Sequence, residues 1–147
     1  MAYENINVSN LRSSLSSLKD ISANKSSLNK VESSITQDEW SGNTKNRIKD
    51  AIKKTNKYYE AIDKYVDKLL KATDYIEEYK RLDKEKEKYT NSYNKTKNKI
   101  SNLKSGQDSS SLKKDCDSYK GKIDANNNKM NQLQMKINEL IEWEANI

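Results

Sequence analysis

The sequence contains no histidine, proline or phenylalanine, and only one cysteine, three glycines and two tryptophans among its 147 residues. A chain with no histidine and a single cysteine, Cys116, can build neither an internal disulfide nor a Cys/His zinc site. No glycine-rich phosphate loop is present, and carboxylates such as Glu77 and Glu78 fall in strongly polar helical stretches. We therefore expect a protein that is not an enzyme and that uses no cofactor, metal or small molecule.

Apolar residues are also scarce: they make up 33% of the chain against 34% charged residues, and the mean hydropathy is −1.15. Such polarity is common in disordered chains. Here, however, the apolar residues recur at helical spacing, which indicates a narrow apolar stripe on long helices. No apolar run reaches the length of a signal peptide or a membrane span. We expect a cytosolic protein, or one exported without a Sec signal.

The first helical stretch is predicted over about residues 9–37, with Ser9 or Asn10 as its N-cap. Its apolar face consists of Leu11, Leu15, Leu18, Ile21, Leu28, Val31 and Ile35. A second, much longer helix is predicted from 44 to 104, capped by Asn43 or Thr44, because no glycine or proline interrupts it. Its stripe consists of Ile48, Ile52, Thr55, Tyr59, Ile62, Val66, Leu69, Thr73, Ile76, Tyr79, Leu82, Lys86, Tyr89, Tyr93, Thr96, Ile100 and Leu103. Two consecutive steps of three, from 76 to 82, shift this stripe around the helix.

The segment "SGQDSSS" (105–111) is predicted to be a loop, in which Gly106 caps the preceding helix and a serine of 109–111 caps the next. The last helix, about 112–146, has apolar residues at alternating steps of four and three, the heptad seam of a coiled coil. That seam consists of Leu112, Cys116, Tyr119, Ile123, Asn126, Met130, Leu133, Ile137 and Leu140. Asn126 is of the type that fixes register at such positions.

These lengths predict an all-α fold. The first and third helices together nearly match the second, so two antiparallel hairpins can form end to end along one long central helix. Their turns would lie at 40–43 and 105–111. A bend near 74–83 would instead fold the chain into one compact bundle; we expect the extended form.

The first turn holds the sequence "WSG", Trp40 to Gly42, between two amphipathic runs of about thirty residues. A helical hairpin with Trp-x-Gly at its turn resembles the WXG superfamily, the small helical proteins of type VII secretion. The resemblance covers about residues 1–83. Residues 84–147 would add a coiled-coil hairpin, as in the longer helper proteins that accompany LXG toxins.

Secreted members of this superfamily carry Tyr-x-x-x-Asp/Glu after the second helix of the hairpin. Two segments fit, "YKRLD" (Tyr79, Asp83) and "YEAID" (Tyr59, Asp63), and position favours Tyr79 and Asp83. Residues four apart share a helix face, so this ring and carboxylate would form one exposed patch. On the alternative interpretation, Tyr79 is a stripe residue and Asp83 an ordinary solvated charge.

The resemblance implies a protein of the bacterial cytoplasm that binds a helical partner, and that either stays in the cell or is itself exported by the type VII route. Candidate partners are the N-terminal domain of an LXG toxin, a second small WXG-like protein or a second copy of the chain, with the secretion ATPase as receptor. Half-exposed stripes provide the surface that a partner helix would bury, with Trp40 closing one end and Gly42 allowing a tight turn. The predicted interface consists of Leu11, Leu15, Leu18, Leu28, Ile48, Ile52, Tyr59, Ile62, Val66 and Leu69.

Two other functions fit the same sequence. Residues 80–104 contain nine basic and three acidic side chains, a net charge of +6, which would suit nucleic acid. Intermixed lysine and glutamate is more typical of a solvated helix face, and the aromatic stacking motifs of nucleic-acid modules are missing. A coiled-coil adaptor or spacer, with an accidental Trp-x-Gly, is the other alternative.

Overall fold

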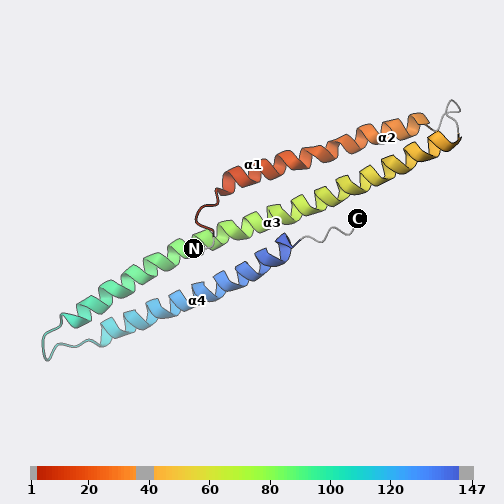
Figure 1. Cartoon of the computed structure of the whole chain (residues 1–147). Coiled ribbons are helices and arrows are strands. Elements are labelled where there is room, and N and C mark those ends of the chain that lie inside the picture. Colours follow the sequence, from red (N-terminus) through yellow and green to blue (C-terminus); the bar gives the residue numbers. More distant parts are fainter. Residues whose placement is uncertain (1–2, 36–41, 143–147) are drawn as a thin grey trace. The chain divides into compact units, whose positions relative to one another are not determined.

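The computed structural model describes residues 3–35 and 42–142, and every regular element in these ranges is a helix. In chain order the elements are α1 (Val8–Lys19), the 3₁₀ helix η1 (Asp20–Ala23), α2 (Asn24–Ile35), α3 (Gly42–Ser101) and α4 (Ser110–Ile141) (Figure 1). The predicted all-α class is confirmed.

The chain divides into two compact units, which we describe separately. Among the described residues, unit 1 consists of 3–5 and 74–139, and unit 2 consists of 6–35, 42–73 and 140–142. The packing therefore changes at residue 74, within α3. The sequence boundary between 1–83 and 84–147 follows a family motif rather than packing, and it stays a prediction.

In unit 2, α1, η1 and α2 lie beside the first part of α3 (Figure 1). Three polar pairs join the two sides: Lys19 Nζ to Asp67 Oδ1 at 2.7 Å, Lys25 Nζ to Glu60 Oε1 at 2.7 Å, and Asn56 Nδ2 to Asn29 Oδ1 at 3.4 Å. Residue numbers rise on one side as they fall on the other, so the paired segments run antiparallel. Leu15, Ile52 and Val66 are buried between the polar flanks.

The N-terminal helical segment differs from the prediction in two ways. Its N-cap is Asn7, whose Oδ1 accepts a hydrogen bond from Asn10 N at 3.0 Å, so the predicted caps Ser9 and Asn10 already lie inside the helix. The single predicted helix is also interrupted by η1. Four residues at the 3₁₀ pitch rotate the following face by about 80° relative to a continuous α-helix. Leu18, near the end of α1, and Ile21, within η1, are both exposed.

The long helix α3 begins at Gly42, so the predicted caps Asn43 and Thr44 lie in its first turn. It is helical throughout to Ser101, including residues 74–83, where we had considered a bend. Every residue of its predicted stripe is buried or half-buried. The stripe therefore follows the shift that the two steps of three predict.

In unit 1, the connection from α3 to α4 matches the prediction only in part: Ser109, in the predicted serine run, directly precedes α4, and its carbonyl accepts from Lys113 N at 2.9 Å. Gly106 does not cap α3, which ends five residues earlier; it lies in a turn closed by Gln107 N donating to Lys104 O at 3.1 Å. Its φ of 89° is the left-handed value that the third residue of a type II turn requires. Asp108 opens α4 by accepting hydrogen bonds from Ser110 N at 2.9 Å and Ser110 Oγ at 2.6 Å.

All nine residues of the seam predicted for α4 are buried or half-buried. Its contacts with α3 again run in opposite order along the chain: Asn126 Nδ2 donates to Leu82 O at 3.3 Å, Lys122 Nζ lies 5.3 Å from the Tyr89 ring centroid, and Lys136 Nζ lies 5.7 Å from that of Tyr75. α4 and the second part of α3 are therefore antiparallel neighbours within unit 1 (Figure 1).

Candidate functional site

The residues of the predicted Tyr-x-x-x-Asp element, Tyr79 and Asp83, lie one helical turn apart on α3 in unit 1. Both are half-buried, and both line a single open cleft of about 380 Å³. The cleft is lined by Tyr3, Glu4, Tyr79, Lys80, Asp83, Lys84 and Glu87. The structure therefore brings the ring and the carboxylate together at a concave surface, as their spacing predicts.

The cleft also contains a residue that the sequence did not single out. Tyr3 packs against Tyr79 edge to face, with ring centroids 4.8 Å apart and an interplanar angle of 85°. Burial raises the pKa of the Tyr3 hydroxyl, and the neighbouring Tyr79 raises it further. No sequence signal marks Tyr3, because it comes from a short turn rather than a periodic element and its partner is 76 positions away in the chain.

The charges of the cleft alternate in sign. Lys80 and Lys84 are four residues apart, as are Asp83 and Glu87, and these four side chains share one side of α3. Acidic side chains thus stand beside basic ones, instead of forming a single-sign field of the kind that attracts nucleic acid. Two aromatic rings with mixed charges are suited to contacting another protein surface.

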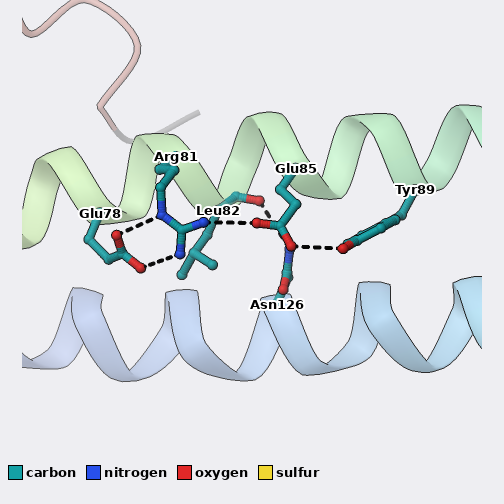
Figure 2. A network of polar contacts seen from close by, with 6 residues as sticks. All are labelled: Glu78, Arg81, Leu82, Glu85, Tyr89 and Asn126. Atoms are coloured by element: carbon teal, nitrogen blue, oxygen red, sulfur yellow. Dashed lines mark hydrogen bonds and ion pairs between the residues drawn. The ribbon is translucent and has the colours of Figure 1, made fainter.

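A polar network occupies a different side of α3, next to α4 (Figure 2). Arg81 donates to both carboxylate oxygens of Glu78 and, at 2.9 Å, to Glu85 Oε2. The Tyr89 hydroxyl donates to Glu85 Oε1 at 2.9 Å. These bonds lower the pKa of Glu78, mainly through Arg81, and that of Glu85, mainly through Tyr89.

The same network reaches the seam of α4. Asn126 is buried and donates to the backbone carbonyl of Leu82 (Figure 2). At 100° per residue, Arg81 and Glu85 each lie about 160° around α3 from Asp83 of the cleft. The network therefore holds α4 on one side of α3 and leaves the cleft on the other.

The predicted interface residues all lie in unit 2, where their exposure differs. Leu15, Ile52 and Val66 are buried within the unit, and Leu18 is 44% exposed. The other six are half-buried: Leu11, Leu28, Ile48, Tyr59, Ile62 and Leu69. Unit 2 also exposes Ile21, Val31 and Tyr58, the last two by 48% and 50%.

Of the predicted corner motif, Trp40 and Ser41 lie outside the described residues. Gly42 is the first residue of α3, exposed and without a positive φ. A Cβ added there would meet nothing within 4 Å. Neither backbone conformation nor close packing therefore requires glycine at position 42.

The second Tyr-x-x-x-Asp candidate, Tyr59 and Asp63, lies in unit 2. Both residues are half-buried, and the Oδ1 atom of Asp63 is buried without a hydrogen-bond partner. Asp63 also lies close enough to Lys19 to contribute to its raised pKa, behind the larger effect of the hydrogen bond to Asp67. This pair faces the packed side of its unit, whereas Tyr79 and Asp83 line an open cleft.

Comparisons with protein-family models, with curated proteins and with solved structures find no match to this chain. Within the described ranges, none of the helices combines the length and apolar character that crossing a membrane demands. The same ranges contain no group of three or more His, Cys, Asp or Glu side chains placed to hold a metal ion.

Proposed function

We propose that this chain is a non-enzymatic helical protein of type VII secretion that binds a partner, the helical N-terminal domain of an LXG toxin, and helps target it for export. It would act in the bacterial cytoplasm and leave the cell, with its cargo, by a Sec-independent route. On this proposal it is related to the longer helper proteins of the WXG superfamily.

The observation that carries the proposal is the placement of Tyr79 and Asp83. An export signal read from a folded helix must present its side chains together on one accessible face. Tyr79 and Asp83 share such a face, line an open cleft and are half-buried rather than enclosed. A secretion ATPase that reads this pair would insert its own side chains into the cleft.

The proposed architecture is a WXG-like antiparallel hairpin, residues 1–83, followed by a coiled-coil hairpin, residues 84–147, with α3 shared between them. Trp40 would lie in the first turn and Gly42 would mark its end, since Trp40 falls between α2 and α3 in the chain and Gly42 begins α3. The antiparallel contacts within each unit support this arrangement.

The toxin would bind unit 2. Leu18, Val31 and Tyr58 keep close to half of their surface exposed, and burying that remaining half would stabilise a complex by roughly 1 kcal/mol each, about half of the value for a fully exposed side chain. A second WXG-like chain or a second copy of this one would use the same surface. The half-buried members of the predicted interface would form its margin.

The proposal is tested by following export of the chain and its toxin from cells. Asp83→Asn removes the charge while keeping the shape, and it should reduce export without changing the helical circular dichroism signal. Asp124→Asn, an exposed residue of α4 in the same unit, is the matched control and should be exported normally. Normal export of Asp83→Asn and of Tyr79→Ala alike would contradict the proposal.

A coiled-coil adaptor is the second candidate, and the regular seam of α4 with its buried Asn126 favours it. An adaptor would bind its partner through helical surfaces without any role for the cleft. Partner capture that persists in Asp83→Asn, together with unchanged export of the partner, would support the adaptor.

A further inference from the structure

The cleft beside Tyr79 is already occupied in part by the chain itself. Residues 3–5, which we call the N-terminal strap, form a turn outside the helices and belong to unit 1. Tyr3 of this strap presents its ring edge to face against Tyr79, at a centroid distance of 4.8 Å. One of the two residues of the proposed export signal is therefore partly covered by a segment that is not part of any helix.

We propose that the N-terminal strap is an autoinhibitory contact, in which Tyr3 covers Tyr79 until a receptor places an aromatic side chain of its own in the same position. This inference rests on the proposed function, because it concerns the regulation of the Tyr79–Asp83 face.

The geometry supports displacement rather than a permanent closure. In an edge-to-face pair, one ring can be replaced by the ring of another aromatic side chain, because any aromatic ring can supply the same edge. The cleft is open and both rings are only half-buried, so an incoming side chain has access to the pair. Short segments outside regular helices also open at lower free energy than the helices they cover.

The charges around the contact would also allow a receptor segment to replace the strap. Glu4 of the strap lines the cleft together with Lys80 and Lys84 of α3. A receptor segment with an aromatic residue next to an acidic one would match the chemistry of Tyr3 and Glu4. We therefore expect the receptor to present an aromatic–acidic pair to this cleft.

The size of the effect follows from the ring contact. Aromatic pairs change an equilibrium by roughly 2- to 13-fold beyond the burial of their area. If a receptor binds only when the strap is displaced, its apparent affinity is reduced by the fraction of molecules that are open. Removing the Tyr3 ring should therefore increase receptor binding and the rate of export by about 2- to 13-fold.

The first measurement tests the cover directly and does not involve export. The full chain is prepared with 3-fluorotyrosine at position 79, and its ¹⁹F relaxation is recorded with a soluble paramagnetic chelate. Tyr3→Ala should increase the paramagnetic relaxation of this signal. Asn5→Ala, a change in the same strap outside the cleft lining, should leave it unchanged. Equal relaxation in the Tyr3→Ala and unmodified chains would overturn the proposal.

The second measurement is export. Tyr3→Ala should be exported faster than the unmodified chain, and Tyr3→Phe, which keeps the ring edge, should restore the slower rate. A loss of export in Tyr3→Ala, as in Asp83→Asn, would overturn the autoinhibitory role and place Tyr3 in the recognition surface. If export depends on neither Tyr79 nor Asp83, the proposed function fails together with this regulatory role, while the ¹⁹F result still decides whether Tyr3 covers Tyr79.

Discussion

Replacing Asn126 by leucine is expected to raise the stability of unit 1 while loosening the register between α3 and α4. Asn126 is 5% exposed at a seam position, and its side chain donates to the Leu82 carbonyl at 3.3 Å, near the long end of the hydrogen-bond range. That carbonyl keeps its own helical acceptor role in α3. The substitution therefore leaves no orphaned backbone group.

The expected magnitude is a difference of two effects. A typical intramolecular hydrogen bond contributes about 0.5–1.5 kcal/mol net, whereas burying a leucine side chain contributes about 1.5–3 kcal/mol. Glu85 loses its contact with Asn126 but keeps Arg81 and Tyr89. We expect the free energy of unfolding to increase by about 1 kcal/mol.

Urea unfolding followed by circular dichroism measures this change. Asn128→Leu is the matched control, because residue 128 lies on the exposed side of α4; it should alter the free energy of unfolding by less than about 0.5 kcal/mol. A decrease of more than about 1 kcal/mol in Asn126→Leu would refute the reasoning, since it would mean that the polar network contributes more than leucine burial can replace.

The register is measured separately. In a Cys116→Ala background, spin labels at Lys95 and Lys114, both exposed, report the distance between α3 and α4. A slip of one heptad would move α4 along α3 by about 10.5 Å. Asn126→Leu should broaden the distance distribution in that direction. A distribution as narrow as that of the unmodified seam would show that the loop and the remaining side chains specify the register.

For three further perturbations the structure predicts the direction of the effect on stability or on a pKa. Leu15→Ala should lower the free energy of unfolding by about 2–4 kcal/mol in urea titrations because Leu15 is buried, whereas the exposed Leu18→Ala should cost less than about 1 kcal/mol. The hydrogen bond from Lys25 is the main cause of the lowered pKa of Glu60. This pair therefore stabilises the fold at pH values above the ordinary glutamate pKa, and its contribution is lost as the pH falls through the lowered pKa. Lys25→Ala should raise the pKa of Glu60 measured by NMR titration. Burial raises the pKa of Tyr3, so docking of the strap contributes its full stability below pH about 10, and this contribution is lost as the pH rises through the raised pKa. The difference in phenolate absorbance between the unmodified chain and Tyr3→Phe should show this titration at raised pH.

Periodicity explains why so much of the helical pattern could be predicted from the sequence. A stripe at steps of three and four can be buried only by an α-helix, and the residues of α3 and α4 that obey it are buried or half-buried throughout. The loop between α3 and α4 was predictable for the same reason, since the pattern stops there and glycine and serine take its place. Tyr79 and Asp83 could be placed on one face because four residues make about one turn.

What could not be predicted depends on local competition or on tertiary contacts. Asn7, Ser9 and Asn10 are chemically similar as caps, so the sequence could not choose among them. Ser109 holds the N-cap position of α4, but the side chain that accepts a hydrogen bond from its first residue is that of Asp108, one residue outside the predicted serine run. Tyr3 belongs to no periodic pattern, and only the folded chain brings its ring to Tyr79.

The high polarity of the sequence extends into the packed seams, where some of the buried residues are polar. Thr73 and Thr96 are buried but donate to the carbonyls of Leu69 and Ser92 in the preceding turn, at 2.8 and 2.9 Å. Satisfying a buried hydroxyl in this way avoids a penalty but adds little stability. Seams built partly of such residues leave each unit with a small free energy of unfolding. A partner that binds only the folded form would increase this free energy through mass action, by about 2.7 kcal/mol when the partner concentration is a hundred times its Kd. On the proposed function, that partner would be the chain that buries the exposed leucine, valine and tyrosine side chains of unit 2.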